Sequence, residues 1–217
     1  MTDLDGPRAA PASGKAANSV VVLLHGLGAD GNDLISIAPI WASALPDTAF
    51  VAPNAPFPCD MAPFGRQWFS LQSRDPADMV AGIRAVADSL NAFLDAELAR
   101  HGLSPDRLAL MGFSQGTMTS LYVAPRRPAP VAGILGYSGA LVHGDVPSDP
   151  ITVRPPVCLI HGTADEVVPF SSMVGAETAL RDANLEVESF PRPGLGHGID
   201  EVGLGVGLAF LRRVLSA

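Results

Sequence analysis

The sequence predicts an α/β fold in which a mostly parallel, doubly wound sheet carries helices on both faces. Short runs of β-branched and aliphatic residues alternate with longer amphipathic segments along most of the 217 residues, and such alternation implies right-handed βαβ crossovers. Most of the short runs are apolar throughout, as expected of strands buried on both faces. We find no internal repeat and no interdomain linker, so a single domain is expected.

Six runs are interpreted as strands. In chain order they are "SVVVLLHG" (19–26), "TAFVAPNAP" (48–56), "RLALMGF" (107–113), "VAGILGYSG" (131–139), "PVCLIHG" (156–162) and "LEVESF" (185–190). The last run alternates apolar and polar residues, which suits an edge strand with one solvated face.

The clearest helix is expected over residues 76–100. Its apolar positions recur at helical spacing, namely Val80, Ile83, Ala87, Leu90, Leu94 and Leu98. Asp75 stands at the N-cap, Pro76 at the first helical position and Gly102 just past the end, a typical arrangement of start and stop signals. Further helices are expected over 33–44, 115–124, 170–183 and 200–215.

Residues 1–18 contain no apolar run and are interpreted as a flexible leader before a domain over 19–217. Two Pro/Gly-rich loops, 53–75 and 139–156, are longer than a crossover needs. Long loops in compact α/β folds are usually functional or disordered.

The composition argues against several classes of partner. A net charge of -8 disfavours nucleic acid and stable insertion into an anionic membrane, because both favour basic surfaces. Cys59 and Cys158 lie far apart in the sequence and are expected to be free thiols in a reducing compartment. The leader has no apolar signal-peptide core, so a cytoplasmic location is expected. The oligomeric state stays open, with a homodimer among the alternatives.

The strongest functional signal is "GFSQG" at 112–116, between an expected strand and an expected helix. The G-x-S-x-G pattern is weak alone, but this context is that of a nucleophile elbow. The two glycines let strand and helix approach closely around Ser114. An ordinary N-cap serine would need no second glycine. Ser138 in "GYSGA" nearly matches the pattern, but no helix can start directly after it, so it is interpreted as a loop or capping serine.

A serine nucleophile needs a histidine base. The five candidates are His25, His101, His143, His161 and His197. His197 is favoured because it lies in "RPGLGHGID", after the last strand and between glycines that free the loop to bring the imidazole over the sheet edge. The alternative without a catalytic role is that His197 is a solvent-exposed loop residue. Of the other four, two (His25 and His161) stand at strand ends, His101 stands at the end of a surface helix, and His143 lies in a loop.

The orienting acid should lie between serine and histidine in the chain. Asp165 follows a buried strand in "LIHGTADEVVPF" and stands too far before the next helix to cap it. The neighbouring Glu166 would turn more easily to solvent. The remaining alternatives lack a preceding buried strand, and these are Asp145, Asp149 and Asp200.

The loop "LLHGLGADGND" after the first expected strand suits an oxyanion hole. The backbone N–H of Leu27 is the expected donor, beside that of Gln115 at a helix N-terminus. The same loop matches G-x-G-x-x-G over 26–31, which could indicate a dinucleotide site. We disfavour that reading because no acidic residue ends the next strand.

These motifs together resemble one known family. "LHGLGADG", "WFS", "GFSQG", "HGTADEVVP" and "GLGHGI", in this order, are similar to the small carboxylesterase/acyl-protein thioesterase (phospholipase/carboxylesterase) family of α/β-hydrolases. The resemblance covers roughly residues 19–215. It implies a capless α/β-hydrolase fold, no cofactor and no metal, and a small-molecule ester or thioester substrate. It also implies Ser114 as nucleophile, Asp165 as acid and His197 as base, with Leu27 and Gln115 in the oxyanion hole.

The chain departs from the family's residue pattern at two positions, and the expected first strands of the family are hard to see in residues 1–18. Thr117 stands where a further glycine usually follows "GFSQG", and Ser70 turns the usual "WFD" into "WFS". The second departure bears on the acyl-binding loop. Large apolar side chains of that loop suggest a substrate surface, although half of them could simply pack it onto the sheet. We expect substrate contacts from Phe64, Trp68 and Leu71, and from Val167 beside the candidate acid.

The leading functional hypothesis is a serine carboxylesterase acting on short- to medium-chain esters. An acyl-protein thioesterase or a lysophospholipase shares the chemistry and differs in the leaving group. From another class, a non-catalytic ligand receptor can arise on this fold when a catalytic residue is lost, but all three candidate residues are present here.

Overall fold

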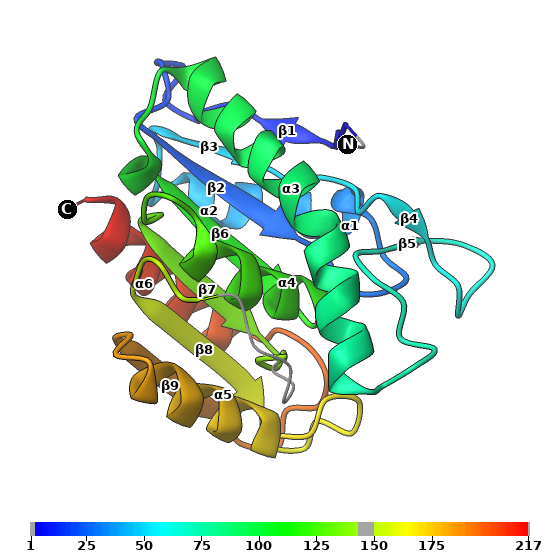
Figure 1. Cartoon of the computed structure of the whole chain (residues 1–217). Coiled ribbons are helices and arrows are strands. Elements are labelled where there is room, and N and C mark those ends of the chain that lie inside the picture. The colour runs from blue at the N-terminus through cyan, green and yellow to red at the C-terminus, as the bar shows by residue number, and fades with distance from the viewer. Residues whose placement is uncertain (1–2, 143–149, 217) are drawn as a thin grey trace.

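Within residues 3–142 and 150–216, which the computed structural model describes, seven strands form one twisted sheet (Figure 1). The strands are β1 (Arg8–Ala9), β2 (Ser19–Leu24), β3 (Thr48–Val51), β6 (Leu108–Phe113), β7 (Gly133–Tyr137), β8 (Val157–Gly162) and β9 (Val187–Arg192). Their spatial order is β1-β3-β2-β6-β7-β8-β9. Every neighbouring pair is parallel except β1 with β3. The α/β-hydrolase fold expected from the sequence is therefore confirmed, with all six expected strands present.

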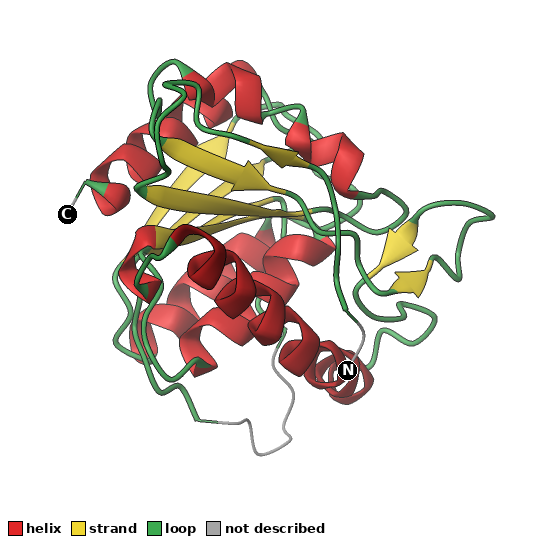
Figure 2. Ribbon diagram, turned by 90° about the horizontal axis from the view of Figure 1, so that it is seen from above, coloured by secondary structure: helices red, strands yellow, loops and turns green. Residues whose placement is uncertain are grey.

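Helices cover both faces of the sheet, as the view from above shows (Figure 2). One face carries α3 (Pro76–His101), α4 (Gln115–Val123) and α5 (Ser171–Asp182); the other carries α1 (Gly31–Ile35), α2 (Ala38–Ala42) and α6 (Glu201–Leu215). Two short 3₁₀ turns, Pro105–Arg107 and Ala124–Arg126, complete the helical content of the described part. Each face has its own apolar core. Helix α4 is buried at every position, which fits its place against the middle of the sheet.

Helix α3 has the ends that its sequence predicts. The Asp75 carboxylate accepts a 2.8 Å hydrogen bond from the N–H of Ala77. Gly102 adopts a left-handed φ of 66° and closes the helix by donating to the carbonyls of Leu98 and Ala99, a conformation that glycine adopts without steric cost. The N-terminal cap fixes where the preceding 53–75 loop must end.

Two expectations about the elements are wrong in detail. The single helix expected over 33–44 is split into α1 and α2. Pro39 stands in the first turn of α2 and has no N–H to continue a helical ladder, so the helix restarts there. The 53–75 loop also contains a hairpin that the sequence did not predict, made of β4 (Phe57–Pro58) and β5 (Arg66–Gln67).

The flexible leader expected over residues 1–18 is wrong for the stretch that contains β1. Arg8 and Ala9 pair antiparallel with β3, and the N–H of Ala52 donates to the carbonyl of Pro7 at 3.0 Å. The Arg8 guanidinium reaches Glu97 on α3 at 2.8 Å. This strand is short and polar and is held by main-chain and ionic contacts, so it leaves no apolar signature in the sequence.

No helix in the described ranges is both long enough and apolar enough to cross a bilayer.

Candidate active site

Ser114 occupies a strained bend between β6 and α4. Its backbone has φ 53° and ψ −114°, a region that non-glycine residues enter only at some cost and often at functional sites. The hydroxyl makes no capping hydrogen bond to α4, so the N-cap alternative does not hold. A Cβ on Gly116 would come within 1.9 Å of the Leu24 carbonyl oxygen, and one on Gly112 within 2.4 Å of the Thr117 nitrogen. Both glycines are therefore required by close packing around the serine.

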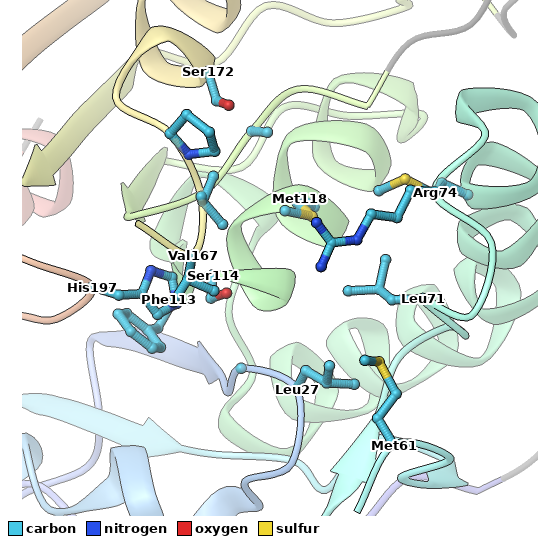
Figure 3. A pocket seen from close by; sticks show the side chains of 15 residues that line it. Leu27, Met61, Leu71, Arg74, Phe113, Ser114, Met118, Val167, Ser172 and His197 are labelled. Atoms are coloured by element: carbon cyan, nitrogen blue, oxygen red, sulfur yellow. The ribbon is translucent and has the colours of Figure 1, made fainter. Parts of the chain in front are cut away.

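His197 and Asp165 form a hydrogen-bonded pair beside this bend. Nδ1 of His197 lies 2.7 Å from Oδ2 of Asp165. The imidazole also packs against the Phe113 ring, with centroids 4.9 Å apart. Figure 3 shows His197 next to Ser114 in the wall of one cavity. Because a carboxylate only accepts, Nδ1 carries the proton and Nε2 keeps a free lone pair.

The side chain of Asp165 is fully buried, yet the pKa of its carboxyl group is lowered. Burial on its own raises the pKa of this group, but hydrogen bonds from His197 and from the N–H groups of Val168 and Val167 outweigh that effect and hold the pKa below its usual value. Oδ1 accepts both backbone bonds at 2.9 Å. This leaves Oδ2 for the histidine, with the carboxylate orientation fixed from both sides.

A second histidine also faces Oδ2 of Asp165. Nε2 of His161 lies 3.2 Å from that atom and 2.8 Å from the carbonyl oxygen of Val168. A carbonyl accepts only, so Nε2 of His161 carries the proton. The sequence reading treated His161 as a packing residue, and its contact with the acid was missed. His161 stands only four residues before Asp165 in the sequence, and this short spacing could have indicated their contact.

The competing candidates are placed elsewhere or engaged. Asp200 caps α6 and pairs with Arg192 at 2.9 Å, and Glu166 is exposed. Ser138 is buried, with its hydroxyl directed at the carbonyl of Gly198 at 3.4 Å, and it does not line the cavity. His101 ends α3. Three further candidates, His143, Asp145 and Asp149, lie outside the described residues.

Leu27 belongs to the loop after β2, and Gln115 follows Ser114 directly as the first residue of α4. Neither backbone N–H donates a hydrogen bond to any group in the described ranges. That of Gln115 is at the first position of α4, where helical N–H groups lack an internal partner and favour negative charge. Leu27 lines the same cavity as Ser114. Two unused donors near a serine hydroxyl are the requirement for an oxyanion hole.

His25 fixes the peptide that carries the Leu27 N–H. Its Nδ1 lies 2.7 Å from the carbonyl oxygen of Gly26, and its Nε2 accepts from the N–H of Ala55 at 3.0 Å. The imidazole is therefore neutral, with its proton on Nδ1. Burial lowers the pKa of His25 below its ordinary value. Because the Gly26 carbonyl belongs to the same peptide plane as the Leu27 N–H, this bond sets the direction of that donor.

The unpredicted hairpin covers the glycine-rich loop after β2. The N–H of Gly28 donates to the Arg66 carbonyl, and the N–H of Arg66 donates to the Ala29 carbonyl, each at 2.9 Å. A Cβ on Gly65 would come within 1.9 Å of the Gly28 oxygen. The loop is thus occupied by protein backbone, which argues against the dinucleotide reading.

An apolar cavity of about 440 Å³ opens beside Ser114 (Figure 3). Of the expected substrate contacts, Leu71 and Val167 line it, whereas Trp68 and Phe64 do not. Trp68 is fully buried and its Nε1–H donates to the His25 carbonyl at 2.9 Å. Phe64 is 74% exposed. The expectation for these two is corrected: Trp68 anchors the loop because its indole N–H has a buried partner, and Phe64 faces solvent at the hairpin tip.

Comparison with known proteins decides the family. The model of the phospholipase/carboxylesterase family matches residues 8–215. The chain belongs to this family. It is 34% identical to acyl-protein thioesterase 1 of Schizosaccharomyces pombe over 82% of each chain. It is 31% identical to a probable carboxylesterase of Oryza sativa, over 88% of this chain and 77% of the relative. The crystal structure of esterase PE8 superposes with a TM-score of 0.92 at 42% identity, over 99% of this chain and all of that one.

The two departures from the family pattern have local explanations. The Thr117 hydroxyl donates to the Tyr137 carbonyl at 2.9 Å, and its side chain fills the space left by Gly136 and Gly139, where a Cβ would come within 2.6 Å and 2.4 Å of it. Ser70 donates to the Asp60 carboxylate at 2.5 Å, which ties two parts of the loop together. Neither residue lines the cavity.

In the described ranges, no cluster of three or more His, Cys, Asp or Glu side chains is arranged to hold a metal ion. Cys59 and Cys158 are both unpaired.

Proposed function

We propose that this protein is a serine carboxylesterase that hydrolyses short- to medium-chain carboxylic esters through an acyl-serine intermediate. The observation that carries the proposal is the 2.7 Å contact between His197 Nδ1 and Asp165 Oδ2 beside a strained serine in an apolar cavity. Membership of the phospholipase/carboxylesterase family supports it, as do relatives named carboxylesterase and esterase.

In this proposal Ser114 is the nucleophile. Nε2 of His197 takes the hydroxyl proton as Oγ attacks the ester carbonyl carbon, and Asp165 stabilises the imidazolium that forms. The N–H groups of Leu27 and Gln115 donate to the developing oxyanion. When the tetrahedral intermediate collapses, His197 returns the proton to the leaving alcohol. A water molecule then releases the acid by the same steps.

The acyl group would lie in the apolar cavity. Its volume of about 440 Å³ falls in the range of small-molecule pockets, roughly 300–1,000 Å³. Leu71, Met118 and Val167 offer apolar surface to an acyl chain. Each methylene buried there contributes about 0.8 kcal/mol, so specificity should rise with chain length until the cavity is full.

A thioesterase activity is the second candidate, because two features favour it. A thiol would leave in the same step that forms the acyl-serine, as an alcohol does, and several curated relatives are named acyl-protein thioesterase 1. A lysophospholipase activity shares the same chemistry. The cytoplasmic location and the homodimer considered from the sequence stay predictions.

The test is a rate series on 4-nitrophenyl esters from acetyl to decanoyl, repeated with acyl thioesters of the same chain lengths. We expect turnover that rises and then falls with chain length, and that is lost in Ser114→Ala and His197→Ala. Ser138→Ala serves as the matched control and should retain turnover. Comparable rates on esters and thioesters would add the second activity. Retained turnover in folded Ser114→Ala would overturn the mechanism.

A further inference from the structure

The cavity beside Ser114 contains one permanently charged side chain. Most of its lining is aliphatic, aromatic or thioether, and the polar exceptions are Ser114, Ser172, His197 and Arg74. None of the described lining residues is Asp or Glu. A lone guanidinium in such a wall is unexpected if the cavity takes only hydrocarbon chains, because a Leu or Met would serve that purpose better.

The guanidinium of Arg74 points into the cavity from the side opposite His197 and Phe113 (Figure 3). Within the described ranges it makes no hydrogen bond and no ion pair, although acidic residues are close in the chain. Those acids are engaged elsewhere. Asp75 Oδ1 caps α3 by accepting from Ala77 at 2.8 Å, and Asp78 Oδ2 accepts from the Ser73 hydroxyl at 2.6 Å. The donors of Arg74 therefore remain available to a ligand.

A carboxylate is the ligand group that this arrangement fits. Arg74 is an exposed residue at the edge of the cavity, so its guanidinium can bind a carboxylate through two parallel N–H···O bonds. A carboxylate that entered the cavity without a cation would lose hydration without replacement. The protein as a whole carries a net charge of -8, which disfavours anions at long range, so a preference for an anion must come from a local cation.

We propose that Arg74 makes the cavity selective for esters whose acyl chain ends in a carboxylate, that is, monoesters of dicarboxylic acids. This inference rests on the proposed function, since the acyl carbon is taken to lie at Ser114. The chain would run from Ser114 toward the guanidinium, which lies between Met118 and Leu71 in Figure 3. Arg74 then determines specificity without touching the reacting atoms.

The test compares matched substrates in wild-type protein and Arg74→Gln. The anionic substrates are the 4-nitrophenyl monoesters of adipic and suberic acid; the neutral partners are 4-nitrophenyl hexanoate and octanoate. We expect Arg74→Gln to lower the ratio of kcat/KM for anionic over neutral ester by roughly five- to tenfold. Kinetics on the neutral esters should change little. Arg74→Lys should keep part of the ratio, and added salt should reduce it in the wild type.

Arg212→Gln is the matched control, because it removes one positive charge from an exposed position on α6, on the other face of the sheet. It should leave the ratio unchanged. If the ratio of kcat/KM for anionic over neutral ester is equal in wild type and Arg74→Gln, the proposal is overturned. Arg74 would then contribute only the aliphatic part of its side chain to the cavity lining. Failure of the proposed function is distinguishable, since the neutral esters would then not be hydrolysed by the wild-type protein.

Discussion

Oε1 of Gln115 accepts a 2.9 Å hydrogen bond from the backbone N–H of Trp68. The same side chain donates through Nε2 to the carbonyl of Phe69 at 2.7 Å, so both ends of its amide hold one segment of the 53–75 loop. Gln115 thus has two roles in the proposed site. In the proposal its backbone N–H donates to the oxyanion, and its side chain holds the loop whose Arg66 is hydrogen-bonded to Gly28 and Ala29, next to Leu27.

Gln115→Ala keeps the backbone donor and removes the loop contacts. We expect a fall in kcat of about tenfold or more, because a displaced loop no longer holds the oxyanion donors in place. The free energy of unfolding should fall by about 1–3 kcal/mol, since two buried backbone groups lose their partners. Ester kinetics and urea unfolding measure the two effects. Unchanged kcat with reduced stability would contradict the role of the Gln115 side chain in holding the loop for catalysis.

Trp68→Phe tests the corrected assignment of this residue as an anchor. The substitution removes the indole N–H that donates to the His25 carbonyl and keeps an aromatic ring in the buried position. Turnover on acetyl and octanoyl esters should fall by the same factor, and the unfolding free energy should drop by about 1–3 kcal/mol. A loss confined to octanoyl esters would show that Trp68 contacts the acyl chain after all.

Leu71→Ala should behave differently, because Leu71 lines the cavity and is only half-buried. Three carbons of apolar contact are lost where a long acyl chain would lie, so kcat/KM on octanoyl esters should fall by roughly tenfold. Acetyl esters, which do not reach this side chain, should be spared. Equal losses on both substrates would make this part of the loop scaffold and place the acyl group elsewhere.

His25 should stay neutral as the pH falls. Its folded pKa is lowered by burial, whereas the unfolded side chain titrates near about 6.5. Below that pH the unfolded state binds a proton that the folded state does not, so stability decreases as pH falls, by at most about 1.4 kcal/mol per pH unit. Nitrogen NMR of the imidazole should show Nδ1–H and neutral His25 at pH 6. A midpoint near 6.5 in the folded protein would contradict the hydrogen-bond assignment.

His161 should act through Asp165, since its Nε2 lies 3.2 Å from Oδ2. We expect His161→Phe to lower kcat by roughly tenfold with KM nearly unchanged, because the Val168 carbonyl loses its partner and the turn whose N–H groups orient the Asp165 carboxylate is held less firmly. His161→Gln, whose amide can donate from a similar position, should recover part of the loss. If both variants lower stability and leave kcat intact, the role of His161 is packing alone.

Much of the fold could be predicted from the sequence because the informative strands are buried on both faces. Runs such as residues 19–24 and 108–111 have no polar alternation and are fully buried, so apolar content alone identifies them. Strand β1 could not be predicted in this way, since its register depends on main-chain bonds and on the Arg8–Glu97 pair. The β4–β5 hairpin was missed for the same reason, because two-residue strands carry no periodic signal.

The candidate site, too, could be predicted from the sequence only in part. Ser114, Asp165 and His197 follow from motif and chain order, because each stands after a strand at the same edge of the sheet. The role of Trp68 could not be predicted, since loop composition does not say which large side chain packs inward. The hydrogen bonds of His25 could not be predicted either. Which of its ring nitrogens carries the proton depends on the N–H of Ala55, thirty residues further along the chain.

The nucleophile itself is tested most directly by covalent labelling. The protein is treated with a fluorophosphonate and the modified residue is identified by peptide mass spectrometry. The account predicts a single adduct on Ser114, absent in Ser114→Ala and formed much more slowly in His197→Ala, because the hydroxyl is then without its base. An adduct on Ser138, or labelling of Ser114 at an undiminished rate in folded His197→Ala, would contradict it.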